Sequence, residues 1–138
     1  MSKTGSFFTL LILLLFAACG EEPVVNIYPP AKGAKIEGLA LIVDPPDPNI
    51  KKSFESLYRF DPEADTVLYI SHKERILCNS NQNVQQKALS RFPHNFLRME
   101  LRRGATLYYS YYIDLDEKAD KSDIERAFGR MKRDLGLR

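Results

Sequence analysis

The alternation of apolar and polar positions predicts a fold of mixed strands and helices after residue 35. Residues 36–43 (IEGLALIV) and 66–71 (TVLYIS) are short runs that are apolar on both faces, which is typical of strands in a covered sheet. Between them, Asp47 and Pro48 provide an N-cap and a first residue for a helix whose apolar spacing continues to Phe60. Strand, helix and strand therefore form a predicted βαβ unit, with a turn over residues 72–75.

Two longer segments, 96–103 and 106–115, alternate between apolar and polar residues and predict a β-hairpin. Alignment of their apolar faces places Leu101 opposite Leu107 and leaves a three-residue loop at 103–105. A two-residue turn would put the apolar residues of the two arms on opposite faces.

The C-terminal segment predicts an amphipathic helix over about 121–135 that lies across the sheet, with Ser122 and Glu125 at the spacing of a capping box. A short strand at 76–78 and a short helix ending at Phe92 are expected before the hairpin. The predicted order is β-α-β-(β)-α-β-β-α, an α+β fold with a mixed sheet and helices packed on it. A ferredoxin-like core with an added strand and helix is the first arrangement to consider.

The N-terminus has a different character. Lys3 precedes a ten-residue apolar run, 7–16, which is followed by the small residues Ala17 and Ala18. A positive start, an apolar core and a small-residue cleavage site are the parts of a secretory leader. As a helix, residues 7–18 would span about 18 Å, well short of the roughly 30 Å hydrocarbon core of a bilayer. The sequence therefore predicts a cleaved signal peptide over residues 1–18.

Residues 15–19 (LFAAC) resemble the lipobox of bacterial lipoproteins, with Phe16 where leucine is commonest. The resemblance covers the leader alone. It implies that the Cys19 thiol receives a diacylglyceryl group, that cleavage precedes Cys19, and that the new amine receives a fatty acid such as palmitate. Two or more acyl chains make membrane attachment stable. In the Gram-negative family, a residue other than aspartate after the cysteine favours the outer membrane; Gly20 stands there, which implies the outer membrane on its periplasmic or surface side.

Residues 20–35 contain three prolines and two glycines without any period, which indicates a tether. We therefore divide the chain into a leader at 1–18, the lipidated Cys19 with a tether to residue 35, and a single domain at 36–138. An extended tether of this length would reach about 50 Å. A few apolar residues in it are suited to adding an edge strand or docking on the domain: Val24, Val25, Ile27 and Tyr28.

The charge balance argues against nucleic acid as a partner. The chain has 20 basic and 18 acidic side chains, and removal of the leader takes away only Lys3 among them. A nearly neutral chain with interleaved charges lacks the basic surface that nucleic-acid binding needs. If Cys19 carries lipid, Cys78 has no partner for an internal disulfide, and burial is the commoner role for such a thiol.

One candidate site follows the two strands of the βαβ unit. Asp44 and Asp47 come after the first strand and His72 after the second, and parallel neighbours would bring them to one sheet edge. Two carboxylates beside an imidazole could hold a metal ion or perform acid–base chemistry, as in a small hydrolase. Capping by Asp47 and an ordinary charged turn at His72 explain the same residues without a site. The sequence carries no established catalytic, metal or cofactor motif.

A second candidate site is one face of the hairpin, where Tyr108, Tyr112, Arg98 and Arg102 are predicted to lie together. Aromatic and guanidinium groups on one face suit recognition of a protein, peptide or glycan. The alternative is a face covered by the last helix or simply wetted by solvent. From these observations we expect a membrane-anchored envelope lipoprotein with a small non-enzymatic binding or assembly domain. The alternatives are the hydrolase and a glycan- or peptide-binding module, and the sequence leaves the oligomeric state open.

Overall fold

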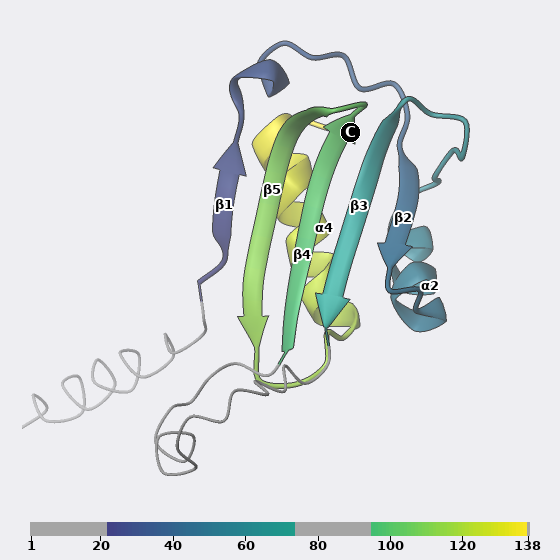
Figure 1. Ribbon diagram of the computed structural model, residues 1–138, viewed down its shortest axis with the longest axis vertical. Coiled ribbons are helices and arrows are strands. Elements are labelled where there is room, and N and C mark those ends of the chain that lie inside the picture. The colour runs from purple at the N-terminus through teal and green to yellow at the C-terminus, as the bar shows by residue number, and fades with distance from the viewer. Residues whose placement is uncertain (1–21, 74–94, 138) are drawn as a thin grey trace, which may run out of the picture.

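The computed structural model describes residues 22–73 and 95–137. These residues form one five-stranded mixed sheet with two helices on one of its faces (Figure 1), which confirms the expected α+β class. Across the sheet the strands are β1 (Val24–Ile27), β5 (Thr106–Leu115), β4 (Asn95–Arg103), β3 (Thr66–Lys73) and β2 (Ala40–Asp44). The helices are α2 (Pro48–Leu57) and α4 (Lys121–Leu135), and a short 3₁₀ turn, η2, spans Pro29–Ala31.

Several sequence-based predictions fall outside the described residues. They are the leader with Cys19, the strand at 76–78, Cys78 and the helix ending at Phe92. In the part of the chain that the structure describes, neither helix has the length and apolar character needed to cross a membrane.

The predicted βαβ unit is present, because β2 and β3 are parallel neighbours with α2 between them in sequence. A ferredoxin-like core separates the two strands of such a unit by a third strand, so the described sheet differs from that arrangement. From β3 the chain continues as an antiparallel meander through β4 and β5. β2 lies at an edge of the described sheet, and Ile42 on its outer face is 46% exposed. Among the residues that the structure describes, no second layer covers this face of β2, although its pattern is apolar on both faces.

The region expected to be a tether contributes β1, the edge strand that its apolar residues permitted. β1 pairs antiparallel with β5, with Val25 opposite Tyr111. The backbone N–H of Tyr28 then donates to the Tyr108 carbonyl over 3.0 Å. The sheet thus begins at Val24 rather than near residue 36, and residues 20–23 are all that separates it from Cys19. Four residues reach at most about 14 Å when extended.

The core lies between the sheet and the two helices. Alternate residues of the strands face the helices, and Phe54 of α2 meets Phe128 of α4 edge to face, with ring centroids 6.1 Å apart. The predicted apolar stripe of α4 is buried as expected, namely Ile124, Ala127, Phe128 and Met131. Every strand, helix and buried core residue described lies between Val24 and Leu137.

The last helix spans the predicted residues, Lys121–Leu135, but its N-cap lies two residues before Ser122. Asp120 is the N-cap, and its side chain accepts from the Asp123 backbone N–H over 2.9 Å, while the Asp123 carboxylate accepts from the Asp120 N–H over 3.0 Å. This reciprocal pair is the capping box, in place of Ser122 and Glu125. The N–H of Asp123 holds the pKa of Asp120 below its usual value, and Gly136, in the left-handed region at φ 64°, ends the helix.

The hairpin is present, but its predicted register is wrong. The arms close at a two-residue turn of Gly104 and Ala105, with Arg103 opposite Thr106. A β-bulge at the Leu101–Arg102 step then adds one residue to β5, so that Leu101 pairs with Tyr109 instead of Leu107. The extra residue compensates for the short turn and returns the apolar positions beyond it to one face.

Candidate functional site

The sheet face opposite the helices, which we call the open face, carries most of the predicted recognition residues. Alternation along β4 places Arg98, Glu100 and Arg102 on this face. Both guanidinium groups donate to the Glu100 carboxylate, and Arg102 Nε reaches Glu100 Oε2 over 2.8 Å. The Glu100 side chain is 4% exposed, whereas those of Arg98 and Arg102 are 50% and 42% exposed. A buried carboxylate therefore orients two cations that solvent can still reach. We call the cluster of Arg98, Glu100 and Arg102 the arginine ladder.

Tyr112 lies beside this ladder, as the sequence predicted, because it is the register partner of Arg98. Its ring stacks on Phe96, with centroids 5.7 Å apart and an angle of 25° between the planes. The Tyr112 hydroxyl donates to Asp114 Oδ1 over 2.6 Å. The ring is thus held in place by one aromatic neighbour and one carboxylate, while part of its surface remains exposed.

Tyr108 does not join the open face, which corrects the predicted site. It lies next to Tyr109 at the bulge, and both side chains are buried as members of the core. The Arg103 guanidinium lies over the Tyr108 ring at 5.7 Å from its centroid, which is a cation–π contact. Tyr108 is the extra residue of the bulge, and its side chain therefore lies in the core instead of on the open face.

Sequence reasoning missed two members of the open face. Glu100 is the centre of the cluster with Arg98 and Arg102, and the alternation R-x-E-x-R over 98–102 was the signal for it. Tyr69 of β3 is opposite Glu100, and its hydroxyl donates to Asp44 Oδ2 over 2.6 Å. That hydrogen bond raises the pKa of Tyr69.

The three residues of the hydrolase hypothesis line one pocket of about 600 Å³ at the carboxyl ends of β2 and β3. Asp44, Asp47 and His72 are joined there by Ser71 and Phe96. The predicted convergence is therefore present. Among the residues described, however, no group of three or more side chains of histidine, cysteine, aspartate and glutamate is arranged to hold a metal ion.

The polar atoms of these three side chains have other partners. His72 is the penultimate residue of β3 and not part of a turn, and its Nε2 donates to the Pro45 carbonyl over 2.8 Å. Asp44 accepts from Tyr69. Asp47 caps α2 by accepting from Asn49 N and Ile50 N over 2.8 and 3.1 Å. These hydrogen bonds hold the loop after β2 and the start of α2. The geometry therefore favours a structural role for the three residues over a catalytic one.

Asp47 also pairs with Lys118, whose Nζ lies 2.9 Å from Asp47 Oδ2. The Lys118 hydrogen bond, and then the N–H of Ile50, hold the pKa of Asp47 below its usual 3.8. A carboxyl group whose pKa is lower in the folded state than in the unfolded state stabilises the protein at pH values above the pKa of the unfolded state. This contribution is lost as the pH falls through the folded pKa.

Substitution Asp47→Ala is therefore expected to lower the free energy of unfolding by about 1 kcal/mol near neutral pH, because it removes both the cap and the ion pair. Asp47→Asn retains a capping oxygen and should cost less. Urea unfolding near neutral pH and again below pH 3.8 checks the sign. The difference between wild type and Asp47→Asn should shrink at the lower pH, and a difference that grows there contradicts the assignment.

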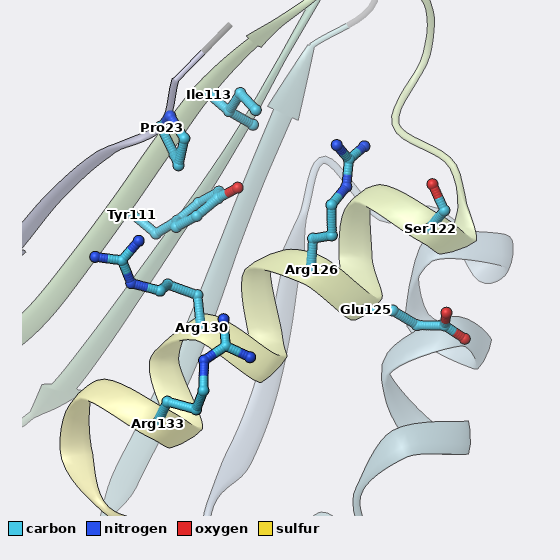
Figure 2. Close-up of a pocket in the computed structure, with 8 residues that line it drawn as sticks. All are labelled: Pro23, Tyr111, Ile113, Ser122, Glu125, Arg126, Arg130 and Arg133. Atoms are coloured by element: carbon cyan, nitrogen blue, oxygen red, sulfur yellow. The ribbon is translucent and has the colours of Figure 1, made fainter. Parts of the chain in front are cut away.

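A second pocket, of about 510 Å³, lies between α4 and β5, beside the residue that precedes β1 (Figure 2). We call it the arginine groove. It was not predicted from the sequence, because its walls come from segments far apart in the chain. Its lining residues are Pro23, Tyr111, Ile113, Ser122, Glu125, Arg126, Arg130 and Arg133.

Comparison of the chain with protein-family models, with curated proteins and with solved structures yields no match. The function is therefore argued from the geometry of these three surfaces.

Proposed function

We propose that this protein is a lipid-anchored envelope lipoprotein whose domain binds a protein partner through the open face of its sheet. The anchor is proposed from the likeness of residues 15–19 to a lipobox, with Cys19 as the acylated residue. The binding role is proposed from the open face, and the observation that carries it is the Arg98–Glu100–Arg102 ladder beside the Phe96–Tyr112 stack.

The composition of this face supports recognition of a protein. Arginine and tyrosine are the residues most often found at the energetic centres of protein interfaces. The ladder and the stack restrain these side chains before binding, which reduces the conformational entropy that an interface must otherwise lose. Ile42, 46% exposed on the same face, adds apolar area at its edge.

The position of the helices supports the same assignment. Both helices lie on one side of the sheet (Figure 1), so the open face is not used for their packing. A partner could therefore contact β3, β4 and β5 together without any rearrangement of the core. In the pocket at the carboxyl ends of β2 and β3, by contrast, the polar side chains already form hydrogen bonds that hold α2 and the loop before it in place.

The paired substitution Arg98→Ala with Tyr112→Ala is expected to weaken binding of the envelope partner by at least a hundredfold, since each anchor of this type contributes about 2 kcal/mol or more. Chemical crosslinking in intact cells, followed by mass spectrometry, would identify the partner and the crosslinked strands. Binding of the purified pair then measures the loss. The matched control is Lys51→Ala with Glu55→Ala, an exposed ion pair on α2, which should leave binding unchanged. Equal loss in both variants, or crosslinks confined to α2, would overturn the assignment.

A further inference from the structure

Three cationic side chains line one side of the arginine groove. Arg126, Arg130 and Arg133 follow the spacing of four and three residues that brings side chains to one face of a helix. All three are exposed, and Figure 2 shows them extending from α4 beside the groove. Guanidinium groups offer planar pairs of N–H donors, which match the oxygens of a phosphate or carboxylate.

The floor of the groove holds a polar group that lacks a protein partner. Tyr111 as a whole is only 3% exposed, but its hydroxyl oxygen is not fully buried and forms no hydrogen bond with any residue in the described ranges. In Figure 2 this hydroxyl is directed toward α4 and the groove. Burial raises the pKa of Tyr111, and the nearby Arg126 and Arg130 oppose that rise. The hydroxyl is a donor that could reach an oxygen of a ligand in the groove.

The arginines keep donors for a ligand although two of them have carboxylate partners. Arg130 uses its Nε to reach both oxygens of Asp134, over 3.0 and 2.9 Å, which leaves its terminal nitrogens available to a ligand. Arg126 pairs with Asp123 on the same helix. Arg133 has no ion pair among the residues that the structure describes. Exposed intrahelical pairs of this kind are weak and are readily exchanged for a stronger anion.

The groove also lies close to the proposed anchor. Pro23 forms part of its wall, and residue 23 is four positions from Cys19, a reach of at most about 14 Å. If Cys19 carries lipid, this short connection would keep the groove within reach of the headgroups. Pro23, which is half-buried, adds an apolar side chain beside the cations, as the boundary between headgroup and acyl chain requires.

We propose that the arginine groove binds the phosphate of an anionic phospholipid headgroup in the membrane that holds the anchor. Arg126, Arg130 and Arg133 contact the phosphate oxygens, and the Tyr111 hydroxyl donates a hydrogen bond to one of them. This inference rests on the proposed function for its choice of a membrane lipid as the source of the phosphate. Binding there would turn α4 toward the bilayer and leave the open face accessible to a partner.

The test uses the mature chain, residues 19–138, produced without acyl groups, because all described core residues lie within it. Sedimentation with phosphatidylcholine vesicles, with and without phosphatidylglycerol, measures binding independently of lipidation. The wild type should bind only the anionic vesicles. The triple variant Arg126→Gln, Arg130→Gln, Arg133→Gln should bind them at least tenfold more weakly, since each arginine near an anionic surface contributes roughly fivefold.

Two further variants separate a site from general charge attraction. Lys51→Gln, Lys52→Gln, Arg59→Gln removes the same charge on and just after α2, and should retain most of the binding. Tyr111→Phe removes only the hydroxyl that lacks a partner, so its thermal unfolding should be unchanged while vesicle binding falls about threefold. Equal losses in the two triple variants, or no effect of Tyr111→Phe, overturn the proposed site.

A third arm identifies the source of the phosphate. Inorganic phosphate and glycerophosphoglycerol are titrated as competitors, with circular dichroism confirming that every variant is folded. Displacement by glycerophosphoglycerol but not by inorganic phosphate supports a lipid headgroup. Absence of vesicle binding by the wild type, together with direct calorimetric binding of inorganic phosphate, would refute the membrane assignment and identify a site for free phosphate. Failure to find lipid on Cys19 would overturn the anchor without changing any of these outcomes.

Discussion

Substitution Cys19→Ser is expected to abolish lipid attachment and to leave the leader uncleaved. The proposed modification uses the Cys19 thiol, and a serine hydroxyl cannot replace it as the thioether-forming group. The N-terminal peptide of the mature wild type should begin at Cys19 and carry the added mass of a diacylglyceryl group and a fatty acid. The variant should retain residues 1–18 and show no added mass. Mass spectrometry of the protein from detergent-solubilised membranes measures both.

A suitable control is globomycin, which inhibits the signal peptidase specific for lipoproteins. Treated wild-type cells should accumulate a precursor that carries diacylglyceryl but retains the leader, a product distinct from that of Cys19→Ser. Unmodified Cys19 in the mature protein, or cleavage at another residue, would contradict the lipobox interpretation. A secretory leader of the ordinary kind would then remain the simpler explanation.

Substitution Glu100→Ala is expected to have the largest effect on stability, about 2 kcal/mol. Removal of one partner from a buried ionic cluster is strongly destabilising, although the exposure of Arg98 and Arg102 reduces the loss here. The two guanidinium groups would also be left as like charges on one strand face. Urea unfolding of both proteins measures the difference through the midpoint and the slope.

Glu100→Gln and Glu55→Ala serve as controls for this substitution. Glutamine keeps the shape and one acceptor oxygen, so its cost should lie between those of wild type and alanine. Glu55 is half exposed and pairs with Lys51 at 3.7 Å, and its loss should change stability by less than about 0.5 kcal/mol. A cost for Glu100→Ala no larger than for Glu55→Ala would show that the ladder contributes little to the fold.

The same substitution links stability to the proposed binding surface. Glu100 holds Arg98 and Arg102 in fixed orientations, so Glu100→Gln should weaken partner binding even where the protein remains folded. In a preorganised site, neighbouring groups fix the orientation of the side chains that contact the partner.

Short-range patterns along the chain were sufficient for much of the fold. Asp47 and Pro48 mark the start of α2 because capping involves residues within one turn of each other. The apolar spacing of α4 and the alternation in β4 and β5 similarly indicated which faces are buried. Period and capping are properties of neighbouring residues, so the sequence reveals them without knowledge of the rest of the molecule.

Pairing between distant segments was decided only in three dimensions. The bulge near Leu101 moved Tyr108 into the core, because register depends on two strands and their turn together. β1 joined β5 across more than eighty residues of chain, a pairing that no local pattern specifies. The apolar residues of the predicted tether indicated only that this segment could add an edge strand or dock on the domain.

The candidate sites divide in the same way. The sequence alone brought Arg98, Arg102 and Tyr112 to one face and Asp44, Asp47 and His72 to one end of the sheet, because strand alternation and parallel order suffice for that. Only the tertiary structure decided which polar atoms already have hydrogen-bond partners, because those partners belong to separate elements. The arginine groove is the clearest case: Pro23, Tyr111 and Arg130 belong to three segments that become neighbours only when β1 and α4 pack beside β5.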